Sequence, residues 1–193
     1  MAAAMSARAL VVVFALLAAG PVGAKSWQGD AGAGALQFEA VQADAKFTGR
    51  FKTYDVRFDF DPAQPAGGRL DVTVALNSTD TADAERDEIL KSAEFFWTER
   101  HPQAKFHATK FRHEGKRWRA DGELTLRGVT KPAAVLFTIA EKTQVLRMKG
   151  DATIRRLPFG VGQGEWQSTE WIGDEVVIRF DLILKPAAAA AKP

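Results

Sequence analysis

The sequence predicts an all-β fold of antiparallel strands, and two observations carry that prediction. Apolar and polar residues alternate over several short runs, which is the period-two pattern of strands with one buried face. Turn signals separate many of these runs, including Asp61-Pro62, Gly67-Gly68 and Glu114-Gly115. About nine candidate strands of this kind fit either an antiparallel sandwich or a closed barrel.

Four runs alternate most clearly. In the first of them Val56, Phe58 and Phe60 face one side, while Arg57 and Asp59 face the other. The clear runs cover residues 55–61, 69–76, 117–127 and 176–184, and noisier ones cover 36–41, 46–54, 103–113, 132–140 and 144–154. Each of these strands is expected to have one dry face and one wet face.

One helix interrupts the strands. Thr79-Asp80-Thr81 offers capping side chains before the segment ADAERDEILKS, whose acidic residues crowd its first turn as the helix dipole favours. The run Glu94-Phe95-Phe96-Trp97 follows it, and three successive large rings cannot all face water at low cost. We expect the helix and these rings to cover or line one end of the fold.

The two ends of the chain predict export and flexible termini. Arg8, the apolar run 9–19 and the small residues up to Ala24 are typical of a Sec-type signal peptide over residues 1–24, cleaved after Ala24. This predicts a periplasmic or secreted protein with no membrane span in the mature chain. The remainder divides into a flexible segment at 25–35, a barrel domain at 36–185 and a disordered tail at 186–193.

Composition excludes several classes of function. The chain has no cysteine, so it has no disulfide, no thiolate nucleophile and no cysteine-based metal site. Its formal net charge of +2 is spread without a basic stripe, so nucleic acid is not an expected partner.

No catalytic or metal-ligating constellation is visible. His107 and His113 lie on one predicted strand, roughly 20 Å apart at about 3.3 Å per residue, so they cannot share a metal ion unless the strand bends sharply. The serines lack a nucleophile elbow. The carboxylates of the predicted helix can pair with Arg86 and Lys91. The sequence therefore predicts no catalytic residue, no metal ligand and no cofactor, and not an enzyme.

The glycine-rich run 160–164 superficially resembles a phosphate-binding loop. A dinucleotide fingerprint opens a helix within a βαβ unit, whereas this run leads into another strand. We interpret its glycines as structural, allowing Phe159, Trp166 and Trp171 to fold over an edge or entrance. Direct contact with a ligand is the alternative interpretation.

Six blocks, taken in order, resemble a known family. They are RFDFDP, a strand leading to NSTDT, RDEILKSAEFF, HPQAKF, GELTLRGVTKP and RRLPFGVGQGEW. This order is similar to that of the YceI-like family of polyisoprenoid-binding, lipocalin-like periplasmic proteins, over about Leu36 to Leu184. The resemblance implies an antiparallel, lipocalin-like barrel of about eight strands with one short helix, enclosing an apolar tunnel for an isoprenoid chain.

Two departures from the family pattern are present. Many members carry a histidine near the first strand, where this chain has residues 38–42 (FEAVQ). The acidic residue that commonly follows the paired phenylalanines is here Trp97. The head-group chemistry or the shape of the tunnel mouth is therefore expected to differ.

Candidate ligand-binding residues follow from the inward strand positions and the aromatic segments. Ordinary core packing is the alternative for each of them. The expected tunnel lining is Phe58, Phe60, Val72, Val74, Leu124, Leu126, Phe137 and Ile154, with Phe95, Phe96, Phe159 and Trp166 near an opening.

Three hypotheses of function remain open at this point. The leading one is a periplasmic carrier or store that holds a polyprenyl lipid or an isoprenoid quinone. The second is a soluble partner that presents quinone to a membrane b-type cytochrome. The third is an enzyme that acts on a lipid substrate through an acidic residue at the mouth.

Overall fold

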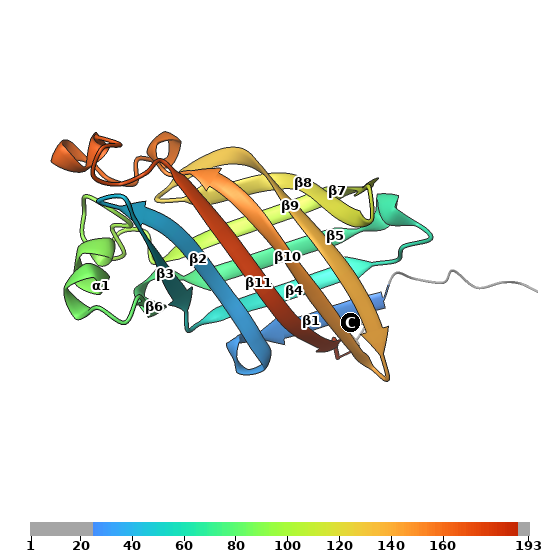
Figure 1. Ribbon diagram of the computed structural model, residues 1–193. Helices are drawn as coiled ribbons and strands as arrows, with labels where there is room; N and C mark the ends of the chain where they lie inside the picture. The colour runs from blue at the N-terminus through green and yellow to red at the C-terminus, as the bar shows by residue number, and fades with distance from the viewer. Residues whose placement is uncertain (1–24, 189–193) are drawn as a thin grey trace, which may run out of the picture.

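The computed structural model describes residues 25–188, and the predicted signal peptide lies outside them. Eight antiparallel strands close a barrel in the order β1, β4, β5, β7, β8, β9, β10, β11, and β11 pairs back with β1 (Figure 1). The ring strands are β1 (Lys25–Asp30), β4 (Tyr54–Phe60), β5 (Arg69–Ala75), β7 (Gln103–Glu114), β8 (Arg117–Leu126), β9 (Val129–Lys142), β10 (Val145–Arg155) and β11 (Glu175–Pro186). The prediction of an all-β antiparallel barrel is confirmed, and closure leaves no open sheet edge around this ring.

Three further strands extend one wall of the barrel. β2 (Gly34–Gln42) pairs with β11 beside β1, β3 (Ala45–Phe51) pairs with β2, and β6 (Thr79–Asp80) pairs with β3. The wall between β11 and β4 is therefore formed by β1 toward one end of the barrel and by β2, β3 and β6 toward the other.

Tight turns set the register of three hairpins. The β2–β3, β8–β9 and β9–β10 connections are two residues long, and both residues of each have positive φ, as in type I′ turns. Their residues are Ala43 and Asp44, Arg127 and Gly128, and Thr143 and Gln144. Five of the six are not glycine, which explains why the turn signals at these positions are weak.

One α-helix lies across an end of the barrel, as expected. α1 (Ala84–Lys91) is capped at its N-terminus by Asp83, whose carboxylate accepts a hydrogen bond from the Arg86 backbone N–H. The predicted capping residue Thr81 instead binds the Asp87 carboxylate through both its backbone N–H and its hydroxyl. Figure 1 shows α1 at the end where the segment between β10 and β11 also lies. That end is called the mouth below, and residues 157–174 are called the mouth loop.

The segment 25–35, expected to be flexible, forms β1, a 3-10 turn (Ala31–Ala33) and the start of β2 in the structure. β1 pairs with β4 along its whole length, and Trp27 is buried in the core. The glycines and alanines of this segment suggested disorder. However, Gly29 and Gly34 lie against the β11 backbone, where a side chain would collide, so the small residues allow close packing of strands.

Candidate functional site

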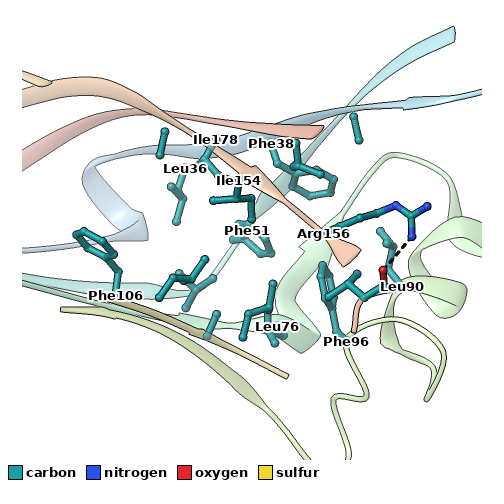
Figure 2. A pocket seen from close by; sticks show the side chains of 18 of the residues that line it. Leu36, Phe38, Phe51, Leu76, Leu90, Phe96, Phe106, Ile154, Arg156 and Ile178 are labelled. Carbon is teal, nitrogen blue, oxygen red and sulfur yellow. Dashed lines mark hydrogen bonds between the residues drawn. The ribbon is translucent and has the colours of Figure 1, made fainter. Parts of the chain in front are cut away.

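A cavity of about 510 Å³ occupies the half of the barrel nearest the mouth. Its walls are formed mainly by aliphatic and aromatic side chains that point inward from strands on opposite sides of the barrel. Figure 2 shows Leu36 and Ile178 across from Leu76 and Phe106, with Arg156 and Phe96 together at one end. A volume of this size lies within the roughly 300–1,000 Å³ of pockets that enclose small organic ligands.

The other half of the barrel is filled. Phe58, Phe60, Phe111, Trp118 and Phe137, here called the distal aromatic cluster, meet inside it from β4, β7, β8 and β9. Ring centroids lie 4.9 Å apart for Phe60 and Trp118 and 5.8 Å apart for Phe58 and Phe137, both edge to face. Phe58 and Phe137 have no exposed surface. Such spacing and burial indicate a packed aromatic core.

Small residues make room for these rings. Ala108 and Ala120 are completely or almost completely buried on β7 and β8, beside the cluster. A Cβ at Gly150 would collide with the Leu136 carbonyl oxygen and come within 2.8 Å of the Phe137 Cβ. The strands can therefore pack closely around the rings only because these positions carry almost no side chain.

The mouth is covered by α1, the aromatic segment after it and the mouth loop. The Glu94 carbonyl accepts hydrogen bonds from the backbone N–H groups of Gly162 and Gln163, at 2.8 and 2.9 Å. The Phe95 ring lies 5.6 Å from that of Trp166, and both line the cavity. The two coverings are thus bound to each other by backbone hydrogen bonds and by aromatic contact.

A buried arginine holds the mouth loop in place. Arg156 is 3% exposed, and its guanidinium donates to the carbonyl oxygens of Val161, Ser168, Ile172 and Gly173 at 2.7–3.3 Å. Burial lowers its pKa, while the nearby Asp174 carboxylate acts in the opposite direction. Four carbonyls replace the water that the cation loses, so it closes the loop without a carboxylate in direct contact among the described residues.

A second arginine lies at the rim of the mouth. The guanidinium of Arg86 lies 4.5 Å from the centre of the Phe47 ring and bonds the Thr81 hydroxyl. It also reaches the Gln42 side-chain oxygen at 3.3 Å and the Asp83 carboxylate at 3.4 Å. Gln42, Asp83 and Arg86 all line the cavity, so three of its polar side chains gather at the mouth.

The hydroxyl of Tyr54 is a polar group that lies inside the barrel. It is buried and has no hydrogen-bond partner among residues 25–188. Burial raises the pKa of this hydroxyl above its ordinary value, and the Asp30 carboxylate contributes in the same direction. The group therefore stays neutral and able to donate a hydrogen bond.

The structure divides the predicted ligand-binding residues into two groups. Those that line the cavity are Val72, Val74, Phe95, Phe96, Leu124, Leu126, Ile154 and Trp166. Phe58, Phe60 and Phe137 lie in the distal aromatic cluster, and Phe159 is a buried residue of the mouth loop itself. None of these four lines the cavity. Period-two alternation predicts that the candidate residues on strands point inward. It does not predict which of these inward positions face empty space.

Arg156 was not among the predicted site residues. Arg155-Arg156 resembles an exposed basic pair, yet the alternation that turns Ile154 inward also turns Arg156 inward. Continuing the alternation one residue past the end of β10 would therefore have predicted that Arg156 points inward.

The histidines take part in separate, unrelated contacts. Nδ1 of His107 lies 2.7 Å from the Asp71 carboxylate on the outer surface, and the His113 ring lies 3.7 Å from that of Trp118. Over residues 25–188, no group of three or more histidine or acidic side chains is arranged to hold a metal ion. Over the same residues, no helix is long and apolar enough to cross a membrane.

Comparison with known sequences identifies a matching family. The family described as the YceI-like domain matches residues 27–184. A UPF0312 protein of Photorhabdus laumondii is 46% identical over 84 residues, which is 44% of this chain and 44% of the relative. Protein YceI of Escherichia coli O157:H7 is 44% identical over 87 residues, 45% of this chain and 46% of the relative. The aligned segment therefore spans less than half the length of either relative.

Solved structures share the fold over most of the chain. BcnA of Burkholderia cenocepacia has a TM-score of 0.76 at 28% identity, covering 80% of this chain and 98% of BcnA. A protein described as a polyisoprenoid-binding domain from Saccharophagus degradans has a TM-score of 0.63 at 12% identity, covering 85% of this chain and 99% of that domain. At such low identity the second likeness establishes the fold alone.

Proposed function

This chain belongs to the YceI-like domain family, and from that premise we propose that it binds an isoprenoid lipid, either a polyprenyl chain or an isoprenoid quinone, inside the barrel. The observation that carries the proposal is the apolar cavity of about 510 Å³ at the mouth end. The Saccharophagus degradans domain, described as polyisoprenoid-binding, has the same fold and supports this choice of ligand.

The energetics favour a ligand with a long apolar chain. Burying a methylene group contributes about 0.8 kcal/mol, so a chain of roughly 15 carbons contributes on the order of 12 kcal/mol. Association costs about 4–15 kcal/mol, and ordering a flexible protein would add to that cost. A preformed cavity whose mouth is fixed by the Arg156 hydrogen bonds avoids much of this further cost.

We also propose that binding, without chemical conversion, is the role of the cavity. Two of the carboxylates near the mouth have structural partners: Asp83 caps α1 and pairs with Arg86, and Asp87 binds Thr81. Glu85 also lines the cavity and is the remaining candidate. A general acid or base needs a carboxylate that is free to exchange a proton with the substrate. Turnover of a lipid by the purified protein, lost on mutating Glu85 at the cavity rim, would favour the enzyme alternative.

Export to the periplasm is part of the same proposal, and it rests on the signal-peptide pattern of residues 1–24. A water-insoluble lipid that crosses the aqueous space between two membranes needs a protein to cover its apolar surface. Fractionation of cells, with the N-terminus of the exported protein determined by mass spectrometry, tests both the location and cleavage after Ala24.

The ligand is tested by extraction and mass spectrometry of protein purified without detergent. We expect about one polyprenyl lipid or quinone per chain. The variant Leu124→Trp fills the cavity and should be recovered folded but empty. Glu123→Trp places the same ring on the exposed outer face of β8 and should retain the lipid. Wild-type protein that is empty and takes up no isoprenoid in solution would contradict the proposal.

A further inference from the structure

The cavity ends part-way along four of the barrel strands. On β4, Val56 lines the cavity, but the next inward residue, Phe58, does not. On β9 the lining includes Val135, and the next inward residue is Phe137 of the distal aromatic cluster. A tunnel open at both ends would have lining residues along the whole of each strand.

The cavity also ends part-way along β10 and β11, which lie between β9 and β1 in the ring. Met148 of β10 lines the cavity and Leu146 does not, and Leu182 of β11 lines it while Leu184 does not. Leu146 and Leu184 are buried and pair directly across β10 and β11. The cavity is therefore closed at its inner end by the distal aromatic cluster and by the aliphatic residues beside it.

The closed end is rigid. Phe60 has ring neighbours at 5.1 Å (Phe58), 5.0 Å (Phe111) and 4.9 Å (Trp118), so no ring in this group can turn aside without displacing another. Beside the cluster, Gly150 has no room even for a Cβ, which would come within 2.8 Å of Phe180 Cζ and Phe137 Cβ. A ligand chain that reaches this level meets a packed surface.

The depth of the cavity can be set against the length of a carbon chain. On β10 the lining runs from Met148 to Ile154, which is about 20 Å along the strand and about 15 Å along the barrel axis at a usual tilt. An extended chain advances about 1.2 Å per bond, so roughly 12–16 chain atoms fit in this depth. With four chain atoms in each isoprene unit, that length corresponds to about three or four units.

The distribution of polar groups gives the orientation of the ligand. Gln42, Asp83, Arg86 and Arg156 line the mouth, whereas the closed end has aromatic and aliphatic walls. An amphiphile gains most when its apolar tail fills the closed end and its polar head stays at the mouth beside hydrogen-bonding groups.

We infer that the distal aromatic cluster limits the length of the chain that this protein buries, to about three or four isoprene units inserted tail first. This inference rests on the proposed function and specifies its ligand: a short-chain prenyl lipid, or the first units of a longer one. Units beyond the limit stay at the mouth in contact with water, so they add no affinity.

The experiment measures dissociation constants by native mass spectrometry for prenyl alcohols of about 10, 15, 20, 30 and 45 carbons. For the wild type we expect the constant to fall at least about tenfold for each added unit up to about 20 carbons. From there to 45 carbons it should change less than about twofold. Equal gains continuing to 45 carbons would overturn the length limit while leaving the proposed function intact, and absence of binding at every length would overturn both.

Variants move the limit in both directions. Phe137→Ala removes a ring from the closed end, so the constant should keep falling for about one unit more. If that variant does not fold, Phe60→Leu makes a smaller opening of the same kind. Ala152→Leu adds atoms inside the cavity and should shorten the limit by about one unit.

Phe159→Leu is the matched control, because Phe159 is equally buried but lies outside both the cavity and the distal aromatic cluster. It should leave the limit unchanged. A limit that does not move in Phe60→Leu or Ala152→Leu, with both variants folded, would contradict the role of the cluster.

Discussion

The two halves of this barrel are built from the same strands but are stabilised differently. In the distal half, interlocked rings and almost no free space hold the strands together. In the half near the mouth, a cavity takes the place of the core, and the covering segments are held by backbone hydrogen bonds and by the buried Arg156 guanidinium. The contrast indicates that one half provides stability and the other provides space for a ligand.

Removing an aromatic ring should give the largest difference in stability loss between the two halves. Phe58→Ala in the distal half should lower the free energy of unfolding by about 3–5 kcal/mol, because it leaves a new cavity among packed rings. Phe106→Ala in the cavity wall should cost about half as much, because part of that ring already faces empty space. Urea denaturation of the ligand-free proteins measures both values. Equal losses would contradict the division into a filled half and a hollow half.

Removing the buried Arg156 guanidinium should cause the next largest loss of stability. Arg156→Met leaves four carbonyl oxygens without their donor, and we expect a loss of about 2–4 kcal/mol. Hydrogen exchange should show the mouth loop losing protection first, with the distal strands unaffected. The control is Arg155→Met, whose exposed pair with Asp174 should contribute less than about 1 kcal/mol. Uniform loss of protection over the whole barrel would show that Arg156 has no local role.

Enlarging a small inward-facing side chain tests the contrast between the filled and the hollow half in the opposite way. Ala120→Leu in the filled half should be destabilising by about 1–3 kcal/mol, since Ala120 has no exposed surface and is surrounded by packed atoms. Ala152→Leu should be close to neutral, because its side chain extends into the cavity. Thermal unfolding of the two variants, compared in the absence of ligand, measures the difference. A large loss in Ala152→Leu would mean that the cavity is not open in solution.

Acid should have a smaller effect on stability, and this effect should be confined to the mouth loop. Burial acts to raise the pKa of Asp174, but the Leu157 backbone N–H and the Arg155 and Arg156 guanidinium groups outweigh it, so the pKa lies below its ordinary value. A carboxyl whose pKa is lowered by folding stabilises the folded state when ionised. That contribution is present above about pH 4 and is lost as the pH falls through the lowered pKa.

Hydrogen exchange of the mouth loop, compared between about pH 5 and pH 3 after correction for intrinsic rates, measures this effect. We expect the loop to open more in acid, and Asp174→Asn to remove most of the difference. The opposite sign, with stronger protection in acid, would contradict the role given to Asp174.

The sequence predicted the strands well and the cavity in part. Period-two alternation located nine strands because inward and outward residues differ so clearly in polarity. It did not predict β1, whose small residues serve close strand packing, or β6, which is two residues long. Alternation also gave the same pattern for Val56, which lines the cavity, and Phe58, which fills the core. Whether an inward residue lines the cavity or fills the core depends on how rings from several strands meet in space. The sequence of one strand does not contain that information.

The most direct test of the account is where a bound prenyl chain lies inside the barrel. Nuclear Overhauser contacts between the chain of a bound prenyl alcohol of about 20 carbons and labelled methyl groups would measure this. We expect contacts with Met148, Ile154 and Ile178, which line the cavity, and none with Leu146 or Leu184, which lie beyond its closed end. Contacts with Leu146 and Leu184, or with outward-facing methyl groups alone, would contradict a cavity that is closed by the distal aromatic cluster.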